Sequence, residues 1–219
     1  MRSRRSETDG PYGVGEEIAH AVTHGAGLAL SLAGAGVLVA RAVAHGDARQ
    51  VTGSAVFGAA LVLLYAASTL YHAIRHPGAK RVLQRIDHAA IFLLIAGTYT
   101  PFTLVSLRGG WAGSLLLAVW GLAALGIVLA SLGKGRRMSL GLYLGMGWLA
   151  VVVLAPLART MEPAGIALLV GGGLAYTAGV TFYLWSRLPY HHAIWHVFVL
   201  AGSALHYACI AGYVLPSSG

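Results

Sequence analysis

Long runs of apolar residues recur along this chain, and short connections with turn formers and most of the charges separate them. A helix needs about 20 residues to cross the ~30 Å hydrocarbon core of a bilayer. Seven runs approach or exceed this length, at 18–42, 51–74, 87–107, 111–132, 139–159, 164–186 and 192–214. The pattern predicts an all-α fold, a bundle of seven transmembrane helices. These helices would form one membrane domain over 16–216, after a polar cytoplasmic tail at 1–15.

Composition supports a membrane protein. Of 219 residues, 57% are hydrophobic and 10% are charged, whereas a soluble domain has about 25% charged residues. We therefore expect a multi-pass protein of the cell inner (plasma) membrane. The first apolar run is too long for the core of a signal peptide and has no obvious cleavage site, so residues 1–15 are interpreted as a retained tail.

The basic residues predict the orientation of the bundle. The chain has 15 Lys and Arg against 7 Asp and Glu, a formal net charge of +8. Short cytoplasmic loops carry an excess of Lys and Arg. With the N-terminus inside, 11 of the 15 basic residues face the cytoplasm, and the other four are Arg41, Arg49, Arg108 and Arg159. The charge thus indicates a cytoplasmic N-terminus and an outside C-terminus, and a membrane rather than nucleic acid as the partner.

Polar residues gather in four clusters at the ends of the predicted helices, at 16–24, 68–72, 87–88 and 191–196. The orientation derived from Lys and Arg alone places all four on the cytoplasmic side. In the first cluster, Glu17, His20 and His24 follow the spacing i, i+3, i+7 and share one helix face. Ionisable groups in membrane helices are costly and usually face the bundle interior or mark function. The clusters are therefore predicted to converge on one pocket.

Three histidines in these clusters are candidate metal ligands. His192 and His196 are one helical turn apart, and His72 would come from a second helix. Cys209 is the only cysteine, so a metal would need His and carboxylate ligands. Three protein ligands leave a fourth position for water, and zinc lowers the pKa of such a water to about 7. We therefore predict a zinc site formed by His72, His192 and His196.

Asp87 and Ser68 are candidate catalytic residues beside this site. Asp87 would orient the water or transfer its proton, and Ser68 would donate a hydrogen bond to an oxyanion or to the water. Less specific roles stay open. Asp87 would equally well cap a helix that begins after a basic connection at 75–85, or pair with Arg85. Ser68 would bond its own i−4 carbonyl, and Tyr12 would belong to the aromatic belt at the membrane interface.

Several short motifs carry a resemblance to a known family. They are EEIA at 16–19 with THG at 23–25, STLYH at 68–72, RIDH at 85–88 with GTYTPF at 97–102, and HAIWH at 192–196. In this order they resemble the bacterial hemolysin III branch of the progestin and adipoQ receptor superfamily, over about 16–213. The resemblance implies a seven-helix bundle with zinc held near the cytoplasmic face by His72, His192 and His196.

The resemblance also implies that Asp87 and Ser68 belong to the same polar constellation, as in the related alkaline ceramidases. Glu17, His20 and His24 are expected around the metal ligands. The chain departs from the family at His20, where asparagine is usual, and at Ala89, where serine is common. Both departures concern the surroundings of the metal rather than its ligands.

Three functions follow as hypotheses. The first is a zinc-dependent intramembrane hydrolase that acts on a lipid amide or ester and serves membrane lipid homeostasis. The second is a sensor or regulator that binds zinc and a long-chain lipid without turnover. The third is the cytolytic pore that the family name implies, which short loops and one polar pocket disfavour because they offer no evident aqueous channel. A membrane lipid is the expected partner in the first two, and the oligomeric state is left open.

Overall fold

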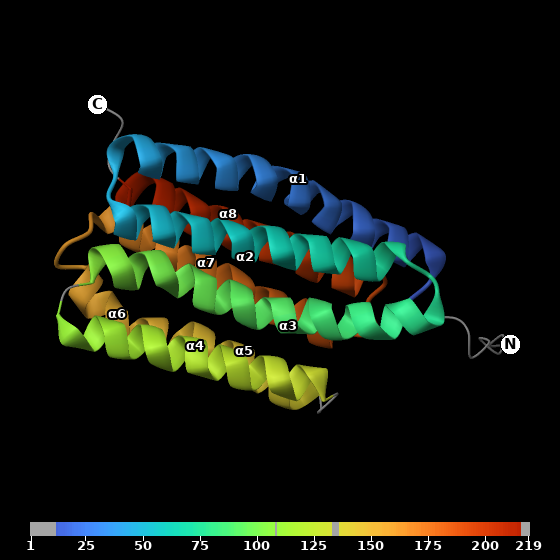
Figure 1. Cartoon of the computed structure of the whole chain (residues 1–219). Helices are drawn as coiled ribbons and strands as arrows, with labels where there is room; N and C mark the ends of the chain where they lie inside the picture. The colour runs from blue at the N-terminus through green and yellow to red at the C-terminus, as the bar shows by residue number, and fades with distance from the viewer. Residues whose placement is uncertain (1–11, 108, 133–135, 216–219) are drawn as a thin grey trace, which may run out of the picture.

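The computed structural model describes residues 12–107, 109–132 and 136–215, and within these ranges the chain is all helical. Its elements are α1 (Val14–His45), α2 (Ala48–Ala73), α3 (Pro77–Pro101), a wide turn η1 (Phe102–Ser106), α4 (Gly110–Ser131), α5 (Arg136–Trp148), α6 (Ala150–Leu157), α7 (Pro163–Leu184) and α8 (His191–Tyr213) (Figure 1). The described part contains seven segments long and apolar enough to cross a membrane, with α5 and α6 sharing the fifth. The predicted fold class is confirmed.

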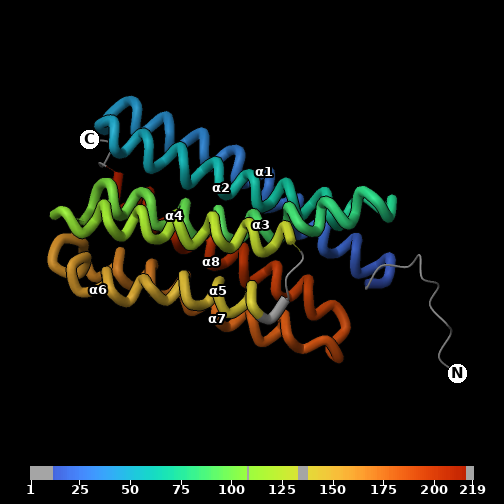
Figure 2. The backbone as a smooth tube through the Cα atoms, turned by 60° about the horizontal axis from the view of Figure 1, so that its bottom comes forward, coloured from blue at the N-terminus to red at the C-terminus, as the bar shows by residue number. Residues whose placement is uncertain are grey.

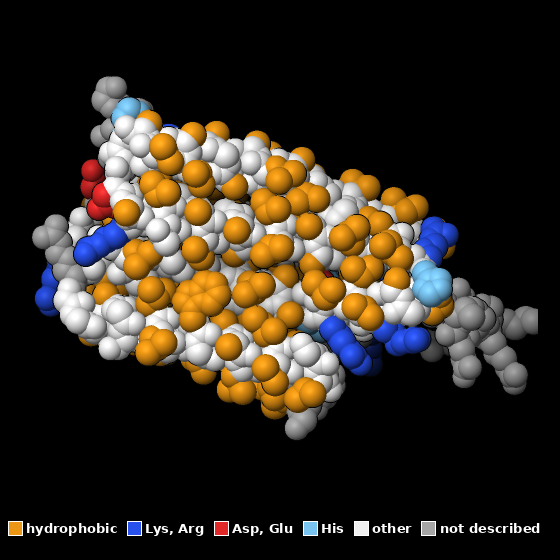
Figure 3. Space-filling model, in the orientation of Figure 1, with side chains coloured by type: hydrophobic (Ala, Val, Ile, Leu, Met, Phe, Trp, Pro, Cys, Tyr) orange, Lys and Arg blue, Asp and Glu red, His pale blue; other side chains and the backbone are white. Residues whose placement is uncertain are grey.

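The surface has the form expected of a protein immersed in lipid. Apolar side chains cover the middle of the bundle, and charged side chains gather at its two ends (Figure 3). Large apolar residues are highly exposed there, with Leu117 at 76% and Leu30 at 71%. The orientation stays a prediction. Most of the predicted tail, at 1–11, and five basic residues of the charge count lie outside the described residues: Arg2, Arg4, Arg5, Arg108 and Lys134.

The helices follow one another around the bundle, and α8 closes the ring against α1 (Figure 2). Helix α1 begins, α2 ends, α3 begins and α8 begins at the same end of the bundle (Figure 1). These are the four helix ends that carry the polar clusters. The structure thus brings the clusters to one end, as the alternation of the seven helices predicts.

Helix α3 begins earlier than the sequence analysis predicts, and this moves Asp87 into the helix interior. The segment 75–85 is mostly the first turns of α3, which starts at Pro77 with His76 as its N-cap. Proline fits the first helical position because it needs no hydrogen-bond partner for nitrogen. Asp87 therefore lies ten residues into the helix, and its interpretation as an N-terminal cap is wrong.

Packing differs between the two sides of the bundle. Helices α1, α2 and α3 pack closely, and a Cβ atom at Gly97 of α3 would lie 2.7 Å from the Cβ atom of Ala60 on α2. Small residues allow this approach where lipid provides no hydrophobic drive for association. Contacts of α5 with α3 and α7 are sparse. The space between these helices is a cavity that reaches the polar end of the bundle.

Candidate metal centre

Three buried imidazoles meet where α2 ends and α8 begins. His72 and His192 are 120 residues apart in the chain, yet donor atoms of His72, His192 and His196 all lie within 4.8 Å of one another. The ring centroid of His72 is 5.3 Å from that of His192 and 5.2 Å from that of His196. The centroids of the two α8 rings are 4.6 Å apart. The structure therefore brings together the three histidines selected from the sequence.

Glu17 fixes the orientation of His72. Its Oε2 lies 2.7 Å from Nδ1 of His72, and its Oε1 lies 2.8 Å from Nζ of Lys80. The ion pair with Lys80 keeps the Glu17 carboxylate ionised. An ionised carboxylate only accepts, so the Nδ1–H of His72 donates the hydrogen bond. The lone pair of His72 is then on Nε2, which is buried and has no hydrogen-bond partner. This arrangement of a carboxylate behind an imidazole is typical of metal ligands.

Thr23 fixes the orientation of His196 in the same way. Its hydroxyl oxygen lies 3.2 Å from Nδ1 of His196, and the hydroxyl donates to the carbonyl oxygens of Ala19 and His20 at 2.8 and 2.9 Å. Since the single hydroxyl proton is engaged by the backbone, Nδ1 of His196 donates to Thr23. The lone pair of His196 is therefore on Nε2, the atom that a metal ion would take.

The donor set fits a metal ion. Two of the three imidazoles have tautomers that leave Nε2 as a lone-pair donor, and the third, His192, has an unpartnered, buried Nδ1. Buried polar atoms without partners are rare and need an explanation such as a bound ion. Three nitrogen donors within this distance provide one, and imidazole suits zinc, copper, iron and nickel. The buried His and Glu groups thus form a possible metal site.

The start of α1 and the start of α8 are tied together above this site. Glu16 accepts hydrogen bonds from the backbone nitrogens of Gly13 and Tyr190, at 3.0 and 3.1 Å. Tyr190 has a positive φ of 56° and is the residue at which the chain turns into α8. The link sets the register of the two helices, so that the face of α1 with His20 meets the face of α8 with His192.

Tyr12 packs against the histidines. Its ring is stacked 5.2 Å from that of His192 and edge-on 4.7 Å from that of His20. These contacts give Tyr12 a place at the metal centre, and its position in an interfacial belt stays a prediction. Its position before α1, next to the cluster 16–24, was the available signal.

The three residues predicted to surround the ligands take different positions. Donor atoms of Glu17, His20 and His72 form a second group within 4.8 Å of one another. The ring of His24 lies parallel to that of His196, with centroids 3.5 Å apart and an angle of 12° between planes. All three side chains are buried. Glu17 holds a ligand by a hydrogen bond, whereas His24 contacts one only by stacking.

Asp87 and Ser68 lie side by side in the wall of the cavity, together with His192 and His196. The Ser68 hydroxyl is not bonded to its own i−4 carbonyl, so that interpretation is wrong, and its side-chain neighbour is the carboxyl of Asp87. Asp87 is buried and belongs to neither group of donor atoms. A molecule in the cavity could therefore contact the Asp87 carboxyl as well as the imidazoles of His192 and His196.

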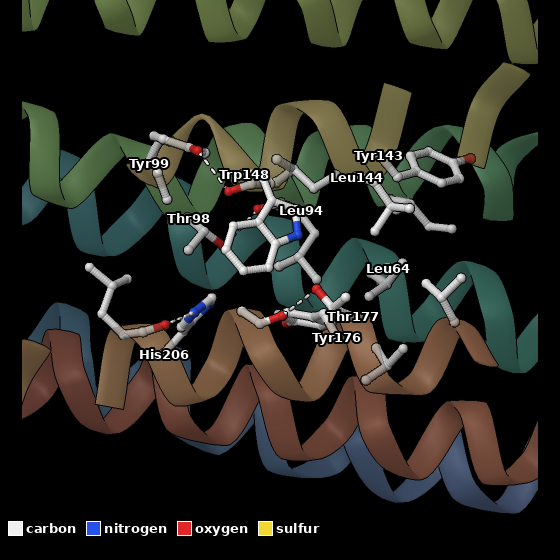
Figure 4. Close-up of a pocket in the computed structure, with 18 of the residues that line it drawn as sticks. Leu64, Leu94, Thr98, Tyr99, Tyr143, Leu144, Trp148, Tyr176, Thr177 and His206 are labelled. Atoms are coloured by element: carbon white, nitrogen blue, oxygen red, sulfur yellow. Dashed lines mark hydrogen bonds between the residues drawn. The ribbon is translucent and has the colours of Figure 1, made fainter. Parts of the chain in front are cut away.

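The cavity has a volume of about 210 Å³ and a mainly apolar lining. Leu94 and Thr98 of α3, Trp148 of α5 and Tyr176 of α7 face it from different sides (Figure 4). It extends from the metal centre to His206, whose Nε2 is 3.1 Å from the carbonyl oxygen of Leu169. The prediction that His206 hydrogen-bonds between helices rather than to a metal agrees with this contact.

Sequence reasoning missed two residues that position the ligands. Lys80 was counted only as a topology signal, although its Nζ binds Glu17 and the carbonyl oxygen of Tyr71. Thr23 entered only through a motif. Lys80 is seven residues before Asp87 and so shares its helix face, a signal that depends on starting α3 at Pro77.

Comparisons with known proteins identify the family of this chain. Residues 12–207 match the family described as "Haemolysin-III related". The chain is 45% identical to Hemolysin-3 of Bacillus cereus over 207 residues, 94% of each protein. It is 44% identical to the Hemolysin-3 homolog of Bacillus subtilis over 92% of this chain and 96% of that protein.

A more distant relative is the human monocyte to macrophage differentiation factor, 30% identical over 172 residues, which are 74% of this chain and 70% of that protein. The relatives thus span bacterial and human proteins. Because the matched segment runs from before α1 into α8, it includes every residue of the candidate metal centre. The chain is a multi-pass membrane protein that belongs to the haemolysin-III-related family, the bacterial branch of the progestin and adipoQ receptor superfamily.

Proposed function

We propose that this chain is a zinc-dependent hydrolase of lipid amide or ester bonds in the cell inner membrane, with its site at the cytoplasmic face. The observation that carries the proposal is the position of two of the three grouped imidazoles, His192 and His196, in the wall of a long apolar cavity that also holds Asp87 and Ser68. A site for a soluble substrate would need no such cavity. The combination matches a substrate with an acyl chain and a polar, cleavable bond.

His72, His192 and His196 would hold the ion, with Glu17 and Thr23 maintaining two of the tautomers. Zinc with three protein ligands polarises a carbonyl and lowers the pKa of a bound water to about 7. The remaining chemistry belongs to the chain. Its metal ligands are on α2 and α8, so the ion would also tie these two helices together.

Asp87 is the residue that handles protons in this proposal. It lies in the cavity wall but outside the donor groups, so it would meet a water rather than the ion. Its carboxylate would accept a proton from that water and deliver it to the leaving nitrogen or oxygen of the lipid. The Ser68 hydroxyl lies beside the Asp87 carboxyl, and it would donate a hydrogen bond to the carbonyl oxygen as negative charge develops there.

The cavity supplies the binding energy for the acyl chain. His192 and His206 both line it and are 14 residues apart on α8, which corresponds to about 21 Å along a helix. Burial of a methylene group contributes about 0.8 kcal/mol when it leaves water. A chain that arrives from the bilayer gains less, so the cavity serves mainly to place the cleavable bond at the histidines.

The test is turnover by the purified full chain in nanodiscs. A ceramide and a diacyl phospholipid, each with a labelled acyl chain, are supplied, and release of the fatty acid is followed by mass spectrometry. We expect release that stops when zinc is chelated and returns when zinc is restored. Lipid binding without release in the zinc-loaded protein would overturn the hydrolase in favour of a sensor. Ion flux in liposomes that survives zinc removal would overturn it in favour of a pore.

A further inference from the structure

His20 is the most completely buried polar side chain of the metal centre without a role in it so far. Its side chain is 0% exposed, and neither ring nitrogen has a hydrogen-bond partner. Burying a polar group without a partner is costly. His72 and His196 each have one nitrogen engaged by the protein, whereas His20 has none. Both nitrogens of His24 also lack a partner, so the placement of the rings has to separate the two residues.

The rings of His20 and the three ligands lie at the corners of an approximate tetrahedron. The centroid of His20 is 4.6 Å from that of His72, 4.9 Å from that of His192 and 5.4 Å from that of His196. The distances among the three ligands are 4.6 to 5.3 Å. Four imidazoles bound to one tetrahedral zinc at Zn–N distances of about 2.0–2.1 Å have centroids about 5.2 Å apart. All six centroid distances approach this value. Among the donor atoms, those of His20 group with Glu17 and His72, and those of His192 and His196 group with His72, so that His72 is common to both groups.

His24 shows that proximity alone does not produce this arrangement. It is on the same helix, one turn after His20, and is similarly buried. However, its ring is stacked on that of His196 at 3.5 Å and nearly parallel. Two rings stacked face to face at this distance direct their nitrogens sideways along parallel planes rather than toward a common ion. The planes of His20 are inclined by 60–72° to those of the three ligands.

His20, like His72, does not line the cavity, whereas Asp87, His192 and His196 do. We propose that His20 is a fourth imidazole ligand of the metal. This inference rests on the proposed metal centre and deepens it. The resting site is then closed by four protein nitrogens, as structural zinc sites are.

Closure gives His20 a regulatory effect on hydrolysis. A water that enters from the cavity would have to displace one of the four imidazoles to reach the ion. His72 and His196 are held in place by Glu17 and Thr23, but no hydrogen bond holds either nitrogen of His20. His20 would thus be the imidazole that is displaced, and it would set the balance between a closed and an open site.

The experiment counts imidazole ligands directly by X-ray absorption at the zinc edge, on the zinc-loaded full chain in detergent. Multiple scattering from the rings distinguishes four imidazoles from three, and the absorption of the cobalt-substituted protein gives an independent reading. We expect four in the wild type, three in His20→Asn, and four in the matched control His24→Asn. A chelator competition should give at least about a tenfold weaker zinc affinity for His20→Asn.

The outcomes separate this inference from the proposed function. Three imidazoles and a light oxygen scatterer in the wild type would overturn the role of His20 and leave the three-histidine centre intact. Absence of stoichiometric metal in the wild type would overturn both. If His20→Asn does not fold, the imidazole count of the wild type decides alone.

Discussion

Two groups of buried polar side chains lie along α8. They differ in whether hydrogen bonds within the protein use all their donors and acceptors. In the middle of the bundle, Ser203 accepts a hydrogen bond from the Tyr65 hydroxyl at 2.8 Å and shares another with the Tyr176 hydroxyl at 2.8 Å. At the end of the bundle, hydrogen bonds fix one nitrogen of His72 and one of His196 and leave the other. The first group satisfies itself, and the second presents lone pairs to one point.

The difference shows which buried polar residues of a membrane protein indicate function. Both groups are buried and both link distant helices, so burial and position do not separate them. A polar network between helices stabilises packing when its members satisfy one another. A group whose fixed tautomers leave convergent donors is organised for a ligand. Substitutions in either group test this distinction.

The largest effect is expected from removal of the metal ligands. The triple variant His72→Ala, His192→Ala, His196→Ala should lose stoichiometric metal entirely, because only weak donors remain. The contrasting variant His206→Ala removes an imidazole of the same helix that bonds the Leu169 carbonyl, and it should keep its metal. Elemental analysis of the purified proteins measures both. Metal retained by the triple variant would refute the assignment.

The next effect concerns turnover without loss of metal. Asp87→Asn should reduce fatty-acid release about 10²–10⁴-fold, the usual contribution of a positioned proton-transfer group. Its metal content should stay unchanged because Asp87 is outside the donor groups. Ser68→Ala is the companion variant, with a smaller loss of turnover and unchanged metal. Loss of zinc from Asp87→Asn would instead make the carboxylate a ligand.

Much of the fold and part of the site could be predicted from the sequence. The seven apolar runs give the helices, and their alternation brings 16–24, 68–72, 87–88 and 191–196 to one end. His192 and His196 follow from helical spacing. The pairing of His72 with Glu17 does not, because it depends on the rotation of α1 and α2 about their axes. That rotation is set by packing over the whole helix length.

The start of α3 differs from the sequence prediction. The charged residues at 75–85 are typical of a connection, but a proline at the first helical position allows the helix to begin at Pro77. The extension gives α3 the turn that carries Lys80, and through it the ion pair with Glu17. The proline predicts the helix start, whereas the ion pair of Lys80 with Glu17 depends on how α1 and α3 pack.

A smaller effect should come from a change in the hydrogen bond between Glu17 and His72. Glu17→Gln keeps the shape but removes the charge that fixes the tautomer, and zinc affinity should fall about 10–100-fold. Lys80→Met leaves the carboxylate in place and should weaken zinc binding less. Chelator competition measures both. Equal affinity in wild type and Glu17→Gln would show that the carboxylate serves packing, as the mid-bundle network does.

The smallest effect should come from the mid-bundle network itself. Ser203→Ala removes the oxygen that joins Tyr65 of α2 and Tyr176 of α7 to α8. Interhelical hydrogen bonds in a membrane protein contribute about 0.6 kcal/mol on average, and Tyr65 keeps a long contact of 3.5 Å with the carbonyl oxygen of Val199. The free energy of unfolding should therefore fall by about 1 kcal/mol in an SDS titration, with metal content unchanged. A variant of normal stability that loses metal would reverse the roles of the two groups.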